Sequence, residues 1–190
     1  MGHTLAISGT HIAVPATTTR LPWSEHPITF DESDQPEHSV DVGRFPLVVS
    51  AVLETVRATK IYMDRGSDSN LIYWDTFEKL KIGTDKLRPS RGSITGIELG
   101  RHMMPLGIID LWVMFDETAN FCQEILYFEV VDFQDTYHAV LGIPCFLKFI
   151  AVPHYAYLKM KMSGPNSVIT ISRDLQNAYQ CDLLAIENVV

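Results

Sequence analysis

Apolar and polar residues alternate along the chain in a way that predicts mainly β-strands from about residue 45 onward. Segments rich in β-branched and aliphatic residues are separated by short polar breaks, which is typical of strands joined by turns. The turn-forming stretch 116–120 lies between two such segments and predicts a hairpin. The predicted strands are 47–49, 51–53, 60–63, 108–115, 125–131, 158–162 and 168–171.

The strand near the C-terminal end has the clearest pattern. Leu158, Met160 and Met162 alternate with Lys159 and Lys161, which predicts one buried face and one face of lysines in water. A Gly-Pro-Asn turn then leads into the next apolar segment, so a second hairpin is expected there.

Helices are predicted to be few and short. Asn70 can cap a helix that ends near Gly83, and Pro144 suits the first turn of a helix that runs through Ile150. Asp174 can cap a last helix. The sum predicts a mainly β fold, a small closed or nearly closed barrel with one or two short helices.

Three regions are expected along the chain. Residues 1–44 contain scattered prolines, a run of threonines and an acidic cluster, and they could bury too little apolar surface to offset the entropy of ordering. We therefore expect 1–44 to be a largely disordered lead-in, 45–172 to form the barrel domain, and 173–190 to form a C-terminal helical tail.

Charge and cysteine content make several classes of function and location less plausible. Lys and Arg total 15 and Asp and Glu total 23, a formal net charge of −8, so direct nucleic-acid binding is disfavoured. Charges interrupt every apolar run, and no membrane partner is expected. The start of the chain has no secretory signal pattern, and the three cysteines are far apart, so we expect reduced thiols in an intracellular, cytoplasmic protein that is not secreted.

The segment Asp64-Arg65-Gly66-Ser67 is the main candidate for chemistry. An apolar strand delivers the Asp64 carboxylate into a tight turn in which Gly66 allows close backbone approach. An aspartate followed by glycine at a strand end is also typical of an ordinary turn. A second segment, 139–144, is an apolar strand that ends in Gly142 and leads into a predicted helix.

The two segments together resemble the retropepsins, the aspartic proteases of retroviruses and LTR retrotransposons. Further stretches are similar to the protease region of plant gypsy-type Gag-Pol polyproteins, over roughly residues 22–182. These stretches are Pro22-Trp23-Ser24, Ile28-Thr29-Phe30-Asp31, Pro46-Leu47-Val48-Val49, Leu87-Arg88-Pro89-Ser90, Met104-Pro105-Leu106-Gly107, Phe128-Glu129-Val130-Val131, Tyr137-His138-Ala139-Val140-Leu141-Gly142 and Tyr157-Leu158-Lys159-Met160-Lys161-Met162.

The resemblance implies an aspartic-type endopeptidase that cleaves a polypeptide between apolar residues. Asp64 would be the catalytic carboxylate, Gly66 and Ser67 would support its turn, and Gly142 would brace it from behind. The chemistry needs two carboxylates that share a proton. The chain holds one Asp-x-Gly-Ser, which implies a homodimer that pairs one Asp64 from each copy.

The resemblance also places substrate contacts outside the catalytic turn. The glycine-punctuated segment 92–100 matches the flap of the family, so Gly96 is expected to contact substrate. Asp68 matches a position that binds the substrate backbone, although an aspartate that caps the next helix would explain it as well.

Arg65 departs from the family pattern, which places Thr, Ser or Gly after the catalytic aspartate. A cation from each copy near a two-fold axis would be repelled by the other, and it would favour an ionised Asp64. The alternative function is therefore a catalytically decayed or domesticated retropepsin fold that acts only as a dimerisation or protein-binding module.

Other functions find less support in the sequence. No His or Cys pair has the short spacing of a zinc site, so neither a metal nor another cofactor is expected. Cys145 lies on a predicted helix, where inert packing is the simpler role than nucleophilic catalysis. No glycine-rich phosphate loop occurs, and a nucleic-acid-binding barrel would need a basic face that this chain lacks.

Overall fold

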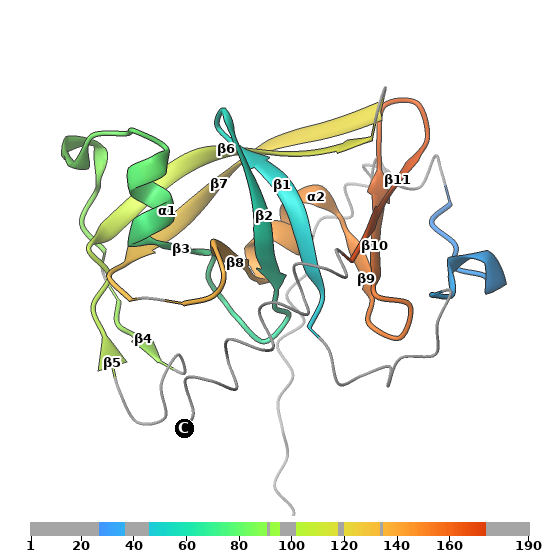
Figure 1. Ribbon diagram of the computed structural model, residues 1–190, viewed down its shortest axis with the longest axis horizontal. Coiled ribbons are helices and arrows are strands. Elements are labelled where there is room, and N and C mark those ends of the chain that lie inside the picture. The colour runs from blue at the N-terminus through green and yellow to red at the C-terminus, as the bar shows by residue number, and fades with distance from the viewer. Residues whose placement is uncertain are drawn as a thin grey trace, which may run out of the picture.

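The structure is a computed structural model that describes residues 27–36, 46–90, 92–95, 102–117, 120–133 and 135–173. Its centre is a closed six-stranded barrel with the strand order β1-β2-β8-β3-β7-β6, in which β1 also pairs with β6 (Figure 1). The strands of the barrel are β1 (Val48–Leu53), β2 (Val56–Met63), β3 (Leu71–Tyr73), β6 (Gly107–Glu117), β7 (Asn120–Val131) and β8 (Ala139–Leu141). The predicted fold class, a mainly β small closed or nearly closed barrel with one or two short helices, is confirmed: the barrel is closed and the described residues contain two short α-helices.

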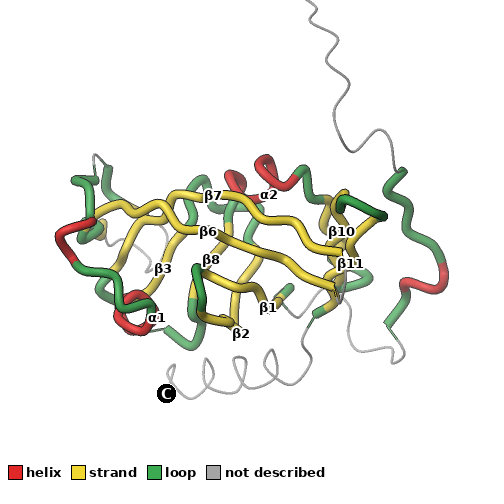
Figure 2. The backbone as a smooth tube through the Cα atoms, turned by 90° about the horizontal axis from the view of Figure 1, so that it is seen from above, coloured by secondary structure: helices red, strands yellow, loops and turns green. Residues whose placement is uncertain are grey.

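Smaller elements surround the barrel. A three-stranded sheet lies at one end of the molecule, as Figure 2 shows from above. Its strands are β9 (Val152–His154), β10 (Lys159–Ser163) and β11 (Val168–Ser172), and a separate hairpin is formed by β4 (Ile94–Thr95) and β5 (His102–Met103). The helices are α1 (Trp74–Lys79), α2 (Ile143–Phe149) and the 3-10 turns η2 (Glu32–Asp34) and η3 (Thr84–Lys86). None of the helices in the described ranges is long and apolar enough to cross a membrane.

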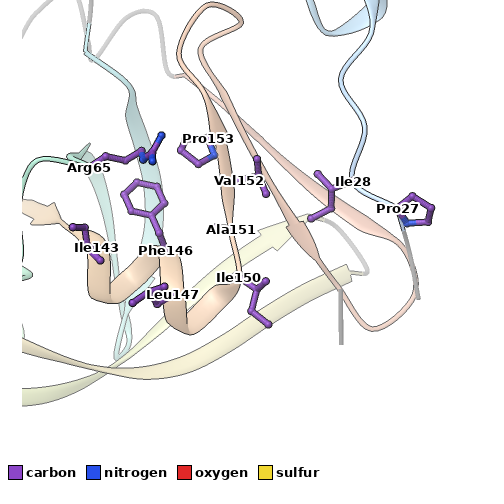
Figure 3. A pocket seen from close by; sticks show the side chains of 10 residues that line it. All are labelled: Pro27, Ile28, Arg65, Ile143, Phe146, Leu147, Ile150, Ala151, Val152 and Pro153. Carbon is purple, nitrogen blue, oxygen red and sulfur yellow. The ribbon is translucent and has the colours of Figure 1, made fainter. Parts of the chain in front are cut away.

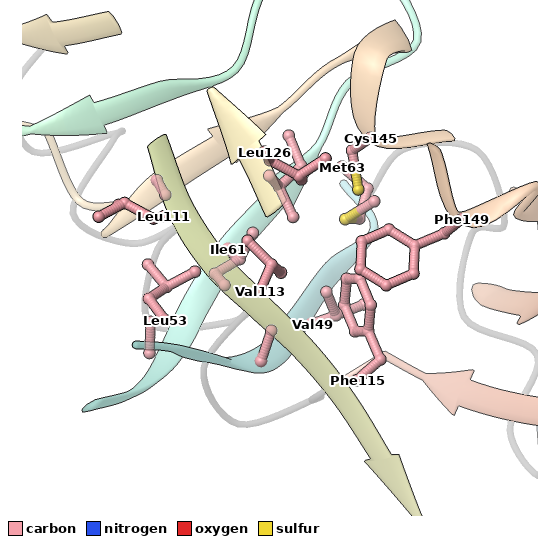
Figure 4. Close-up of a cluster of buried hydrophobic side chains, with 14 of the residues drawn as sticks. Val49, Leu53, Ile61, Met63, Leu111, Val113, Phe115, Leu126, Cys145 and Phe149 are labelled. Carbon is pink, nitrogen blue, oxygen red and sulfur yellow. The ribbon is translucent and has the colours of Figure 1, made fainter. Parts of the chain in front are cut away.

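The core fills the barrel and extends under α2. Alternate residues of the strands point inward, where Leu53, Ile61 and Val113 are fully buried (Figure 4). Helix α2 closes one side, because the rings of Phe115 and Phe149 meet edge to face with centroids 5.0 Å apart. Cys145 is also buried in this cluster, and burial raises the pKa of its thiol, so it packs as an inert apolar side chain.

Strand β8 makes the connection that defines the site. It lies between β2 and β3, parallel to β2 with Ile61 opposite Ala139, and antiparallel to β3 with Leu71 opposite Val140. The chain from β2 to β3 therefore loops around the end of a strand that comes much later in the sequence. This crossing brings the loop after β2 against the end of β8.

The predicted helix from Asn70 to Gly83 is partly wrong. Leu71–Tyr73 forms β3, and the helix begins only at Trp74. All three β3 residues are buried and pair with β7 and β8, so tertiary pairing overrode the local helical pattern. The predicted helix that follows Gly142 is confirmed as α2, and it ends at Ile150 in the left-handed conformation with φ 51°.

Within the lead-in expected to be largely disordered, the structure describes residues 27–36, which lie on the β9–β11 sheet. The Lys161 ammonium contacts Asp34 at 2.7 Å, and the Lys159 ammonium contacts the same carboxylate at 3.6 Å. Lys161 also lies over the ring of Phe30, 4.8 Å from its centroid. The hairpin of β10 and β11 is confirmed, but its lysine face is covered: these two side chains are only 13% and 19% exposed.

We expect an Asp34→Asn substitution to release residues 27–36 from the sheet. The hydrogen bond from Lys161 lowers the pKa of Asp34, so this ion pair stabilises the folded state above the ordinary carboxylate pKa and loses its effect as pH falls through the lower folded value. Wild type should therefore show the same release in acid, below about pH 4. Hydrogen exchange of residues 27–36, corrected for intrinsic rates, measures both effects. Unchanged exchange in the variant at neutral pH would contradict the expectation.

Candidate active site

Asp64 lies directly after β2, at the start of the loop that crosses β8. Its backbone N–H donates to the carbonyl of Leu141 on β8 at 2.9 Å, and its own carbonyl accepts from the N–H of Ser67 at 3.3 Å. The side-chain Oδ1 accepts a hydrogen bond from the N–H of Gly66 at 2.8 Å. The carboxylate is thus held in a tight turn, half-buried.

A glycine at position 66 allows the Asp64 carboxylate to lie close to the backbone of the turn. A Cβ at this position would lie 3.1 Å from Oδ1 of Asp64, tighter than ordinary van der Waals contact. Any larger residue would press on the carboxylate or break the hydrogen bond that orients it. The sequence pattern predicted this requirement, and the geometry supplies its reason.

Ser67 joins the turn to α2. Its carbonyl accepts the N–H of Ile143, the first residue of α2, at 2.8 Å. Its hydroxyl donates to the carbonyl of Ser69 at 2.8 Å, so the side chain also stiffens the loop that follows. Both bonds fix the path of the chain rather than the carboxylate itself.

Gly142 lies where the two segments cross. A Cβ there would lie 2.5 Å from the carbonyl oxygen of Ser67 and still closer to that of Ser69, so only glycine fits between them. Its φ of −94° is one that any residue adopts, so the requirement is one of space. The structure thus brings Asp64, Gly66, Ser67 and Gly142 together in one crossing.

Asn70 is the structural residue of this crossing that sequence reasoning misread. It is fully buried, and its Nδ2 donates to the carbonyl of Tyr127 at 3.0 Å. Its Oδ1 accepts the N–H of Gly142 at 3.0 Å. The side chain therefore links the loop after β2, the β8–α2 turn and β7. In the sequence, an Asn at the start of a predicted helix is equally typical of a helix cap. Its role as a link between distant segments depends on the closed barrel.

An Asn70→Ala substitution is expected to lower the free energy of unfolding by about 1–3 kcal/mol, because the buried N–H of Gly142 and the partly buried carbonyl of Tyr127 each lose their hydrogen bond to Asn70. Chemical denaturation followed by circular dichroism measures this change. Gln123→Ala, which removes an exposed amide from β7, is the matched control and should change stability little. Equal stability of the two variants would contradict the role assigned to Asn70.

Asp64 faces a cavity of about 630 Å³. Residues of the loop after β2 line it, together with the aromatic side chains of Tyr62, Tyr73 and Tyr137. Gly92, Ser93 and Ile94 line it from the side of the β4–β5 hairpin, which is the expected flap. Gly96, the predicted flap contact, lies outside the described residues.

Asp68 lines the same cavity with an exposed side chain. It does not cap the following helix, because α1 begins six residues later and has Tyr73 at its N-cap position. The structure therefore excludes the helix-cap explanation for Asp68, and its side chain lines the cavity.

The Arg65 side chain points to a different surface. It lines an apolar cavity of about 950 Å³ together with α2 and β9, where Phe146 and Pro153 lie beside it (Figure 3). Its backbone also hydrogen-bonds Tyr155. The guanidinium thus does not line the cavity that Asp64 faces. Within the described ranges, no group of three or more His, Cys, Asp or Glu side chains could hold a metal ion.

Comparison with known proteins gives structural similarity only. No protein-family model matches the sequence, and no curated protein matches it. The retroviral protease-like domain of Ddi1 from Leishmania major is similar at a TM-score of 0.48 and 15% identity, over 68% of this chain and 94% of that one. A retropepsin-like aspartic protease from Rickettsia conorii is similar at a TM-score of 0.42 and 16% identity, over 65% of this chain and 80% of that one.

Proposed function

We propose that this chain is an aspartic-type endopeptidase domain with Asp64 as its catalytic residue. One observation carries the proposal. The Asp64 carboxylate is oriented by a glycine N–H, sits on a loop fixed by the crossing with β8, and faces a cavity of about 630 Å³. A rigidly held carboxylate at the floor of a cavity is suited to acid–base chemistry on a bound peptide.

The reaction requires a second carboxylate. Two aspartates close together share one proton, because two like charges at short range cannot both be ionised cheaply. The ionised one takes a proton from water, whose oxygen attacks the peptide carbonyl carbon, while the protonated one donates to the carbonyl oxygen. Collapse of the tetrahedral intermediate breaks the C–N bond. The carboxylic acid formed by the uptake of the water proton donates that proton to the leaving nitrogen, and a hydroxyl of the intermediate returns its proton to the other carboxylate, so the pair again holds one proton.

We propose that the second carboxylate is Asp64 of a second copy. The chain has one Asp-x-Gly-Ser segment, since Asp75-Thr76 and Asp135-Thr136 are followed by Phe77 and Tyr137. An isologous dimer about a two-fold axis supplies the same residue twice. The similarity of residues 22–182 to plant gypsy-type proteases further supports an origin in a retrotransposon polyprotein, with a polypeptide as substrate.

The test is incubation of the purified chain with a peptide library at mildly acidic pH, with and without pepstatin, beside sizing in solution. We expect pepstatin-sensitive cleavage and a species of twice the 21.4 kDa chain mass at the concentrations where cleavage occurs. A monomer that cleaves no peptide would overturn the proposal.

A second candidate is a non-enzymatic dimerisation or protein-binding module. The observation that favours it is Arg65, a cation directly after Asp64. Two such cations near a two-fold axis would repel each other and weaken the dimer that pairs the two carboxylates. An inert but dimeric chain would support this candidate.

An Arg65→Gly substitution is expected to strengthen the dimer and raise kcat/KM, because it removes this repulsion. For a partly solvated charge pair we expect a change of about two- to fivefold in the dimer dissociation constant. Arg65→Lys keeps the charge and is the matched control. Analytical ultracentrifugation and the peptidase assay measure the two effects, and equal values for wild type and Arg65→Gly would remove Arg65 as an obstacle.

A further inference from the structure

The cavity in front of Asp64 has an acidic wall. The described residues that line it include four carboxylates and no Lys, Arg or His. Besides Asp64, these are Asp68 on the loop after β2, Glu129 on β7 and Asp135 before β8. The three come from separate segments, so the fold itself gathers them around one cavity.

Two of these carboxylates are held in place by hydroxyl groups. The Tyr73 hydroxyl donates to Oδ2 of Asp135 at 2.9 Å, and the Ser90 hydroxyl donates to Oε2 of Glu129 at 3.1 Å. Oδ1 of Asp135 already accepts from the N–H and hydroxyl of Thr136 and from the N–H of Tyr137. A carboxylate oxygen accepts more than one hydrogen bond, so Oδ2 of Asp135 and the Glu129 carboxylate can still receive a donor from a ligand. Their positions are therefore fixed before a ligand binds, which lowers the entropic cost of recognition.

An aromatic surface lines the same cavity. The rings of Tyr62 and Tyr137 stack with centroids 5.3 Å apart and an interplanar angle of 23°. Both line the cavity that Asp64 faces. Flat aromatic faces attract cations and also pack against the alkyl stems of Lys and Arg.

The carboxylates also act on two nearby tyrosines, of which Tyr62 lines the cavity. Burial raises the pKa of Tyr62, and the charge of Asp64 raises it further. Burial likewise raises the pKa of Tyr127, with added effects of Asp68 and Glu129. The same potential that resists a tyrosinate attracts a cation.

We infer that the substrates of this site are peptides that carry a Lys or Arg side chain next to the scissile bond, with its stem on the Tyr62–Tyr137 stack and its charge at Asp135 and Glu129. This inference rests on the proposed function, and it departs from the apolar preference that the sequence resemblance implies. Arg is expected to bind better than Lys, since its planar guanidinium stacks on rings and bonds carboxylates with two N–H groups.

The test compares three matched peptides that differ at one position beside the scissile bond, which is Arg, norleucine or Glu. We expect kcat/KM for Arg to exceed that for norleucine by about tenfold at low salt, as cation–π and partly screened ion-pair contributions together allow. The advantage should shrink as ionic strength rises. Norleucine cleaved as fast as Arg would overturn the inference and leave the proposed function standing.

Charge-neutral variants test whether the carboxylates of the acidic wall cause the preference for Arg over norleucine. Glu129→Gln and Asp135→Asn keep the size of the side chain and remove its charge, and each should reduce the Arg-over-norleucine ratio severalfold. Asp85→Asn removes an exposed carboxylate on η3 and is the control that should leave the ratio intact. A ratio unchanged in the Glu129→Gln, Asp135→Asn double variant would contradict the assignment.

A binding measurement separates this inference from the proposed function. Fluorescence anisotropy of the same labelled peptides with the Asp64→Asn variant reports recognition without turnover. Tighter binding of the Arg peptide, with no cleavage by wild type, would support the acidic wall and overturn the peptidase proposal. No preference in either assay would overturn the inference itself.

Discussion

An Asp64→Asn variant is expected to lose peptidase activity by at least about 10²–10⁴-fold, the contribution of a positioned acid or base to such reactions. In the proposed dimer the substitution removes both members of the pair, so neither proton transfer remains. The amide oxygen of Asn can still accept the N–H of Gly66, which bonds Asp64 at 2.8 Å in wild type. The fold and its thermal midpoint should therefore be unchanged.

Asp75→Asn is the matched control for this experiment, because Asp75 is an exposed aspartate on α1, away from the catalytic turn. It should retain wild-type kcat/KM. Circular dichroism and sizing of both variants show whether fold and assembly are kept. Full activity of Asp64→Asn would overturn the catalytic assignment, whatever the behaviour of the control.

A Gly142→Ala variant is expected to lose about 1–3 kcal/mol of folding stability together with most of its activity. The added methyl group would lie 2.5 Å from the carbonyl oxygen of Ser67, so backbone must move, and overpacking of this kind costs that amount. The displaced segment is the same loop that orients Asp64. Denaturation and the peptidase assay should thus change together.

Gly92→Ala is the control for this substitution, since a Cβ there meets nothing within 4 Å. Its stability should match wild type within about 0.5 kcal/mol. Wild-type stability of Gly142→Ala would show that the crossing is looser than the structure indicates.

Much of the fold could be predicted from local pattern. The hairpins β6–β7 and β10–β11 follow from alternation and turn residues, and α2 follows from Pro144 and the glycine before it. The tight turn of Asp64, Gly66 and Ser67 could also be predicted, because it depends on residues that are neighbours in sequence. Local steric preference and side-chain period determine such features.

Other features depended on pairing between distant segments. Asn70 and Gly142 are 72 residues apart, and their hydrogen bond exists only because β8 inserts between β2 and β3. Because of the same pairing, Leu71–Tyr73 forms a strand and not the helix that the sequence pattern predicted. The acidic wall likewise joins Glu129 and Asp135 to the catalytic loop through the closed barrel.

The sequence by itself indicated the longer strands, the position of the Asp64 turn and that its aspartate is followed by a cation. Tertiary structure alone decided that β8 holds this turn, that Arg65 lines another cavity and that Asp34 covers the lysines of β10. The physical reason is that propensity and turn chemistry act over a few residues, whereas burial and strand order depend on contacts between segments that the chain separates widely.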